Sequence, residues 1–274
     1  YYAELANRLV LLSGLAMIVV LTILAFRQQY SYQTKKMIAF VCLMVASLVF
    51  WSLYQTAPMG LVVFIENNVD MQLFGFKIAP QWIQNVNTIV IVLGGPLLSM
   101  LYNRLREKGI DITIPAQFSA ALLLIGLGFL VLPLGIGFAN TIGQTHINWM
   151  IASYILQSIG ELLLSPVGYA MIGRLAPSHL QGLMMGSWMM MTGVASTLSS
   201  YFSSAMSTNA KNIDLFVSNV QYSNVFIKLG LMAVVMAGII YLFSGSLNRL
   251  ISSDKEEVLS EDENIHSSSE LEAA

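Results

Sequence analysis

Apolar residues run in stretches long enough to cross a lipid bilayer, and this feature limits the fold more than any other in the sequence. Seven such stretches lie at about residues 9–26, 37–64, 83–102, 115–138, 147–172, 183–205 and 226–247. A membrane-spanning helix needs about 20 consecutive, mainly apolar residues. Inside a bilayer, only helices and closed barrels satisfy every backbone hydrogen-bonding group. We therefore predict an all-α membrane protein with these seven spans.

The composition excludes a water-soluble globule. Only 10% of the 274 residues are charged and 56% are hydrophobic, whereas soluble domains carry roughly 25% charged residues. Eight of the fifteen acids lie in residues 252–274, which have few bulky apolar side chains. Such a segment cannot bury enough apolar surface to fold, so we predict a disordered acidic tail.

The basic residues set the expected orientation, because cytoplasmic loops of membrane proteins are enriched in Lys and Arg. Placing the loop at 27–36 in the cytoplasm puts nine of the thirteen basic residues on that side. The acidic tail then also faces the cytoplasm. The first residue is Tyr rather than Met, and we expect the chain to be part of a larger protein.

Glu161 is the one ionisable residue that this assignment places well inside a span. An acid at the centre of a membrane helix costs roughly 2.5–3.5 kcal/mol, and such residues face a watery cavity or a partner of opposite charge. Glu161 is then either a structural acid or a carboxylate that binds a proton or a substrate. We expect that no basic residue of this chain serves as a partner in the middle of the membrane, because Lys228 is expected near the outer surface and Arg174 at the cytoplasmic end. The partner is then expected in another part of the protein.

Polar residues share the helix face of Glu161. Gln157 precedes it by four residues and Ser165 follows it by four, which places all three on one side of a helix. Pro166 removes one backbone hydrogen bond nearby. This polar stripe suits a ligand such as an ammonium group, although ordinary helix packing also accounts for Ser165 and Pro166.

The segment "SIGELLLSPVGYAMIGRLAP" (158–177) resembles the tenth span of the proton-coupled oligopeptide transporters, a branch of the major facilitator superfamily. Residues 49–70, 76–105 and 181–203 resemble the seventh, eighth and eleventh spans of that family, in the same order. The resemblance covers residues 30 to about 249.

This resemblance implies the C-terminal six-helix bundle of a major facilitator fold, preceded by one helix of an inter-bundle hairpin. The expected domains are residues 1–29 for the hairpin helix, 30–251 for the bundle and 252–274 for the cytoplasmic tail. The expected partners are the lipid bilayer, as a multi-pass protein of a bacterial inner membrane, and an N-terminal six-helix bundle of the same protein.

The resemblance also implies roles for individual residues. Glu161 matches the acid that binds the amine of a di- or tripeptide and takes part in proton coupling. Four further residues match positions that line the peptide site: Ser165, Asn87, Trp51 and Trp188. Apart from these matches, we predict gating or pocket roles for a second group: Tyr54, Gln55, Gln157 and Thr192. For the two Trp residues the plainer alternative is an interfacial anchor, and for Asn87 it is a hydrogen bond between helices.

One position departs from the family pattern. Many members have two Glu residues after the seventh-span Trp, as in W-x-x-E-E-Q, but here Tyr54 and Gln55 take their places. Neither side chain can supply the acidic side of a salt bridge between bundles. Either a different gate operates or the proton route is altered.

The expected function is proton-driven import of di- and tripeptides by alternating access. We expect no enzymatic activity, no metal, no nucleic acid and no cofactor apart from the proton as coupling ion. No nucleophile–base set, Gly-rich phosphate loop or His and Cys cluster is present in the sequence. The alternatives are the same scaffold carrying nitrate or a drug-like anion, a channel, or a membrane subunit that assembles other proteins.

Overall fold

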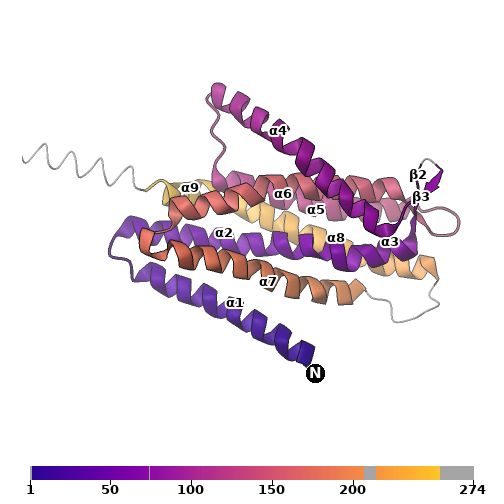
Figure 1. Ribbon diagram of the computed structural model, residues 1–274, viewed down its shortest axis with the longest axis horizontal. Helices are drawn as coiled ribbons and strands as arrows, with labels where there is room; N and C mark the ends of the chain where they lie inside the picture. The colour runs from indigo at the N-terminus through magenta and orange to yellow at the C-terminus, as the bar shows by residue number, and fades with distance from the viewer. Residues whose placement is uncertain (1, 74, 207–213, 254–274) are drawn as a thin grey trace, which may run out of the picture.

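The computed structural model describes residues 2–73, 75–206 and 214–253, which form a bundle of long helices (Figure 1). The predicted acidic tail falls almost entirely outside these residues. The helical elements, in chain order, are α1 (Tyr2–Phe26), α2 (Ser31–Thr56), η1 (Ala57–Leu61), α3 (Val62–Asn68), η2 (Pro80–Gln84), α4 (Asn85–Glu107), α5 (Ile114–Gly137), α6 (Ile147–Leu175), η3 (Ser178–Leu180), α7 (Gln181–Met206), α8 (Leu215–Leu242) and α9 (Ser244–Ile251).

The described residues include four two-residue strands, which lie in the loops at one end of the bundle (Figure 1). β1 (Val69–Asp70) pairs in parallel with β4 (Thr145–His146), and so joins the loop after α3 to the start of α6. β2 (Gln72–Leu73) and β3 (Phe76–Lys77) form an antiparallel pair. These pairs fix the loops at the end of the bundle from which α6 starts.

Six helical segments in the described residues are long and apolar enough to span a membrane: Glu4–Phe26, Ser31–Asn68, Pro80–Glu107, Ile114–Gly137, Ile147–Leu175 and Leu215–Leu242. The prediction of seven spans is confirmed for these six. The remaining segment is helix α7, which is 26 residues long, but its many Ser and Thr residues lower its mean hydropathy.

The last span begins earlier than predicted, and this corrects the placement of Lys228. We expected this span to start at about residue 226, whereas α8 begins at Leu215 and ends at Leu242. Lys228 therefore lies in the middle of a long apolar helix rather than at its outer end, with its side chain exposed. The prediction that Glu161 is the one ionisable residue well inside a span is therefore wrong, because Lys228 also lies well inside a long helix.

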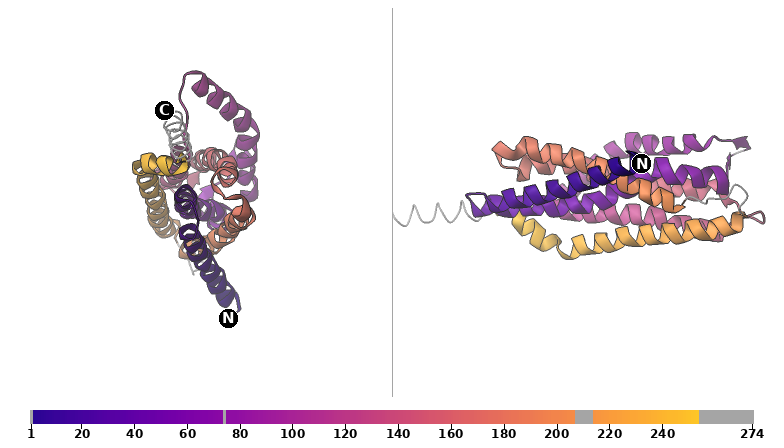
Figure 2. Two further views of the ribbon diagram at one scale, coloured as in Figure 1. Left: turned by 90° about the vertical axis from the view of Figure 1, so that its left-hand side faces the viewer. Right: turned by 90° about the horizontal axis from the view of Figure 1, so that it is seen from below.

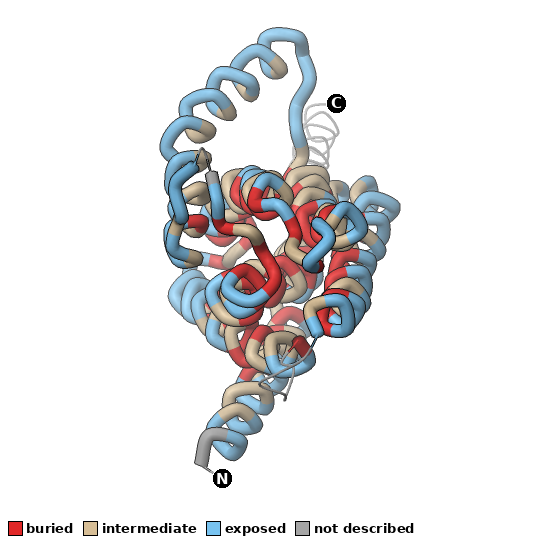
Figure 3. Tube along the Cα trace, turned by 90° about the vertical axis from the view of Figure 1, so that its right-hand side faces the viewer, coloured by how far each residue is buried: buried red, intermediate tan, exposed pale blue. Residues whose placement is uncertain are grey.

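The core lies where α5 packs between α6 and α8, and where α2 packs on α7. α1 and α4 project from opposite sides of this core (Figure 2). No residue of α4 is buried, and its tube is coloured as exposed along most of its length (Figure 3). α4 makes its main contacts with α6. The other face of α4 and the adjoining surface of the bundle are therefore not covered by other described parts of the chain.

The helix that starts at Ser31 changes its winding in the middle. After α2, five residues from Ala57 to Leu61 form a π-helical turn, and α3 then continues to Asn68. Pro58 lies in this turn, where it lacks the N–H that a regular α-helix would use. Single π-helical turns of this kind occur frequently at functional sites.

Candidate functional site

Glu161 of α6 is half-buried and accepts two hydrogen bonds on one carboxylate oxygen. The Tyr54 hydroxyl, from α2, donates to Oε2 over 2.7 Å, and the Asn87 side-chain amide, from α4, donates to the same atom over 2.8 Å. Both donors are neutral, and no cation forms an ion pair with Glu161 in the part of the chain that the structure describes. Three helices therefore meet at a carboxylate whose negative charge is held by neutral donors.

Asn87 connects this carboxylate to the preceding turn of α6. Its Nδ2 atom also donates to Ser158 Oγ over 3.0 Å, and the Ser158 hydroxyl donates to the backbone carbonyl of Tyr154 over 2.7 Å. These bonds hold the otherwise exposed start of α4 against α6. The position of Asn87 thus depends on the same helix that carries Glu161.

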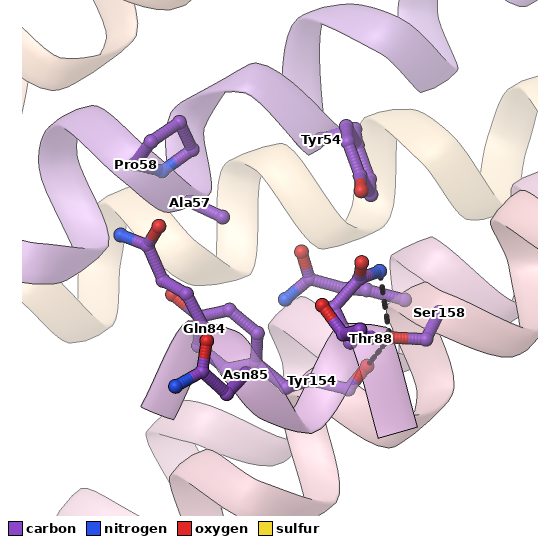
Figure 4. Close-up of a pocket in the computed structure, with 10 residues that line it drawn as sticks. Tyr54, Ala57, Pro58, Gln84, Asn85, Thr88, Tyr154 and Ser158 are labelled. Atoms are coloured by element: carbon purple, nitrogen blue, oxygen red, sulfur yellow. Dashed lines mark hydrogen bonds between the residues drawn. The ribbon is translucent and has the colours of Figure 1, made fainter. Parts of the chain in front are cut away.

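A pocket of about 300 Å³ lies beside these residues (Figure 4). Three parts of the fold line it: α2 and η1 (Tyr54, Ala57, Pro58), η2 and α4 (Gln84, Asn85, Asn87, Thr88) and α6 (Tyr154, Gln157, Ser158). All of these residues except Ala57 and Pro58 carry a hydroxyl or a side-chain carboxamide, and none is charged. The pocket is therefore polar and neutral, with the Glu161 carboxylate at its edge.

Of the predicted residues, Glu161, Asn87 and Tyr54 are brought together directly, and Gln157 lines the same pocket. Trp51 lies close by: its ring meets the Tyr54 ring edge-on, with centroids 5.6 Å apart. Its indole N–H is buried without a hydrogen-bond partner in the described residues. The predicted binding roles of these residues are compatible with their places, and they stay predictions.

Trp188 lies elsewhere. It is 1% exposed, and its ring packs over Gly168, where an added Cβ would overlap the indole, and edge-on against Phe118 at 6.4 Å. Its surroundings are those of a core residue between α5, α6 and α7. The predicted role of Trp188 in lining a substrate site also stays a prediction, without support from the pocket geometry.

Three further predicted residues lie outside the pocket lining. Ser165 and Gln55 are half-buried and make no side-chain hydrogen bond in the described part of the chain. The Thr192 hydroxyl donates to the Met189 carbonyl of its own helix over 2.7 Å. Among the described residues, none of these three side chains is hydrogen-bonded to the Glu161 carboxylate.

The sequence reasoning missed Tyr154 and Ser158, which line the pocket together with Gln157. Both could have been found, because Ser158 precedes Glu161 by three residues and Tyr154 by seven, and residues at these spacings share a helix face. We considered only residues four positions before and after Glu161, and this spacing identifies Gln157 and Ser165 but not Tyr154 or Ser158. Gln84, Asn85 and Thr88 gave no comparable signal, because the angle of α4 to α6 decides where they lie.

Comparisons with known proteins identify the family of the chain. A family model described as the POT family matches residues 1–223. The dipeptide and tripeptide permease A of Salmonella typhimurium is 36% identical over 230 residues, which cover 84% of this chain and 45% of the relative. The protein of the same name from Escherichia coli is 33% identical over 230 residues, with the same coverage. The chain spans about half the length of the curated relatives it matches.

Solved structures agree on the fold. A POT family transporter in complex with 5-aminolevulinic acid has a TM-score of 0.76 and 27% identity, covering 89% of this chain and 48% of that one. A peptide transporter POT in complex with sulfate has a TM-score of 0.79 at 24% identity, covering 91% and 48%. The predicted fold, the C-terminal bundle of a major facilitator protein with one preceding helix, is confirmed.

Proposed function

The chain belongs to the POT family, and from this premise we propose that it forms part of a proton-driven symporter that imports di- and tripeptides. The family consists of permeases rather than enzymes. The observation that carries the proposal is the Glu161 carboxylate, which lies at the edge of a neutral polar pocket without a cationic partner in the described residues. Substrate sites of such transporters lie between two repeats near the bilayer midplane.

The hydrogen bonds of Glu161 suit it to an amine. Oε2 accepts from both Tyr54 and Asn87, whereas Oε1 makes no hydrogen bond within the described residues. A peptide's α-ammonium group would supply the missing positive charge and donate to Oε1. Charge-assisted hydrogen bonds of this kind are roughly twice as strong as neutral ones.

We propose that the Glu161 carboxylate also carries the coupled proton. Tyr54 and Gln55 stand where many relatives have acids, so the carboxylate available in this region is Glu161. A protonated Glu161 has no negative charge with which to hold the amine. Alternate occupation of the carboxylate by a proton and by a peptide would couple the two fluxes.

The open surface beside α4 and α6 is where we place the second six-helix bundle of the full-length protein. α4 buries none of its residues within the described chain, although it carries large exposed apolar side chains such as Leu93 and Leu97. The other proposed surroundings are the lipids of a bacterial inner membrane, with the C-terminal segment in the cytoplasm. Alternating access then consists of a rocking of the two bundles about the peptide.

The test is uptake of labelled dialanine by the full-length protein in cells or proteoliposomes with an inward proton gradient. Glu161→Gln should lower uptake by about 30-fold or more, because removing one partner of a charged pair costs upward of about 2 kcal/mol. Glu66→Gln is the matched control, since Glu66 is an exposed acid of α3. Uptake by Glu161→Gln at the wild-type rate would refute the proposal. Stronger competition by nitrate than by unlabelled dipeptides would point to another solute.

A further inference from the structure

The pocket beside Glu161 contains two buried polar atoms that have no hydrogen-bond partner in the described residues, Gln157 Oε1 and the Tyr154 hydroxyl. We propose that these atoms form a subsite for a carboxamide, and that the transporter prefers peptides whose first residue is Gln or Asn. This inference rests on the proposed function, since it assumes that the peptide amine binds at Glu161.

The orientation of the Gln157 side chain follows from its neighbours. The Ser153 hydroxyl donates its single proton to the Gly128 carbonyl over 2.7 Å, so its oxygen can only accept from Gln157. The Gln157 nitrogen must therefore face Ser153, and the two atoms lie 2.9 Å apart. Gln157 Oε1 is left as an acceptor on a side chain that lines the pocket and is 2% exposed.

Gly128 allows this arrangement, because a Cβ there would come within 3.1 Å of Gln157 Cγ and 3.2 Å of the Ser153 carbonyl oxygen. α5 and α6 can therefore approach closely behind the Gln157 side chain. The Gln157 side-chain amide is fixed by its hydrogen bond to the Ser153 hydroxyl, which in turn donates to the Gly128 carbonyl.

Tyr154 supplies the complementary group. It lies three residues before Gln157 on the same face of α6, is 4% exposed, and also lines the pocket. Its hydroxyl has no partner in the described residues, although buried polar groups are nearly always hydrogen-bonded. The pocket thus offers one fixed acceptor and one hydroxyl that can donate.

A carboxamide matches this pair, since its NH₂ group can donate to Gln157 Oε1 while its oxygen accepts from the Tyr154 hydroxyl. A carboxylate side chain would place a second negative charge beside Glu161 and would have no proton for Gln157. A lysine side chain would compete with the peptide amine for Glu161, because the residues that line the pocket are all neutral and offer it no separate counter-charge.

The position in the peptide follows from the place of the pocket. Tyr54 and Asn87 both bind Glu161 Oε2 and also line the pocket. A side chain that enters here is therefore attached close to the amine that binds the carboxylate. Such a side chain belongs to the first residue of a peptide rather than to its last.

The experiment compares transport of Gln-Ala, Met-Ala, Ala-Gln and Ala-Ala by the full-length protein, each as kcat/KM. Met has nearly the shape of Gln but lacks its amide. Gln-Ala should exceed Met-Ala by about tenfold, because each neutral hydrogen bond contributes a factor of about 2 to 12. Ala-Gln should show no such advantage over Ala-Ala.

The variants Tyr154→Phe and Gln157→Leu should each lower the ratio of Gln-Ala to Met-Ala by about three- to tenfold. The ratio is taken within each variant, so that differences in expression cancel. Tyr222→Phe is the matched control, because Tyr222 is buried in the aromatic cluster with Phe64 and Phe226. Gln157→Glu keeps the volume of the side chain and should raise uptake of Lys-Ala relative to Gln-Ala.

Two outcomes would overturn the subsite while leaving the proposed function in place. A ratio near one in the wild-type protein, with Ala-Ala transported normally, would mean that water rather than substrate satisfies the two atoms. A ratio above one that neither Tyr154→Phe nor Gln157→Leu changes would place the preference elsewhere. Failure to transport Ala-Ala as well would refute the proposed function, and the subsite with it.

Discussion

The two sides of α5 and α6 are built in different ways. On one side α5 packs against α8 through Gly126 and Gly230, where a Cβ on either residue would lie 3.0 Å from the backbone oxygen of the other. On the other side α6 faces α4, which buries none of its residues and leaves a polar pocket between them. We refer to the first contact as the glycine seam.

The difference reflects what holds helices together in a membrane. Lipid tails are as apolar as the side chains, so helices associate through close packing of small residues and through interhelical hydrogen bonds. The glycine seam uses both, since the Ser119 hydroxyl of α5 also donates to the Ala237 carbonyl of α8 over 2.8 Å. On the pocket side, the Gln157 Oε1 atom and the Tyr154 hydroxyl have no hydrogen-bond partner in the described residues. Unpaired buried polar atoms lower the stability of a fold, and a ligand that bonds to them would offset this cost. Substitutions should therefore affect folding on one side and transport on the other.

The largest effect is expected at the seam, for Gly230→Leu. A Cβ at this position would meet Leu130 Cγ at 2.7 Å as well as the Gly126 carbonyl, and backbone atoms cannot move aside as a flexible side chain can. Overpacking typically costs about 1–3 kcal/mol, and we expect the upper end. The measurement is the thermal unfolding midpoint of the purified full-length protein. Gly238→Leu, on the same helix but at a position where a Cβ would meet no atom within 4 Å, should leave that midpoint nearly unchanged; an equal loss in both variants would contradict the contrast.

Asn87→Ala should have the next largest effect, and it should appear in transport. The substitution removes a donor to Glu161 and the bond to Ser158, and hydrogen bonds to charged groups contribute about 1.5–3 kcal/mol. We expect kcat/KM for dialanine to fall about tenfold or more, together with a modest fall in the unfolding midpoint, because the contact of α4 with α6 is weakened. The control is Asn67→Ala, since Asn67 bonds only to the Val63 carbonyl of its own helix. Loss of stability without loss of transport would assign Asn87 to helix packing.

Tyr54→Phe should have a smaller effect of the same kind. It removes one donor to Glu161 while keeping the ring that packs against Trp51 and leaving the Asn87 bond in place. We expect kcat/KM for dialanine to fall about three- to tenfold, through weaker positioning of the carboxylate. Tyr102→Phe is the control, because the Tyr102 hydroxyl donates to Gln117 at the far end of α4. Equal effects of the two variants would remove any special role for Tyr54.

The smallest effect is expected for Lys228→Leu. Lys228 is exposed in the middle of α8 and makes no hydrogen bond or ion pair with the described residues. A lysine at the centre of a membrane helix is unfavourable, although its long side chain can extend toward the interface. We expect unchanged dialanine uptake and only a small rise in unfolding free energy, because extension of the lysine side chain toward the interface already offsets much of its cost. A clear loss of uptake would show that this face of α8 also takes part in transport.

The sequence was sufficient for the helical fold and for the centre of the site. Glu161 stood out because an acid inside an apolar run is expensive, and the resemblance paired it with Asn87. The structure then placed Tyr54, at the position that departs from the family pattern, directly on the carboxylate. The start of α8 was missed because polar residues such as Gln221 and Asn224, both exposed, interrupt its apolar run.

Other features depend on how helices pack, which one sequence does not reveal. From the sequence alone, Trp188 fits equally well in a substrate pocket or in the core. The structure packs its ring over Gly168, which has no side chain to prevent this contact, and its predicted role in a substrate site stays a prediction. Tyr154 is an ordinary aromatic residue in sequence, and becomes notable only because its hydroxyl is buried without a partner in the described residues.

The π-helical turn at Ala57–Leu61 has a consequence for the side chains on either side of it. Each residue of a regular α-helix turns its side chain by about 100° from the last, and a π-helical turn accommodates one residue more than an α-turn. Tyr54, before the turn, faces Glu161, while Phe64, after it, packs against Tyr222 and Phe226. Deleting one residue of the π-helical turn would give a more regular α-helix. In that helix Tyr54 could no longer face Glu161 while Phe64 packs against Tyr222 and Phe226. The irregularity sets the rotational phase between the part of the helix that meets the ligand and the part that anchors the bundle.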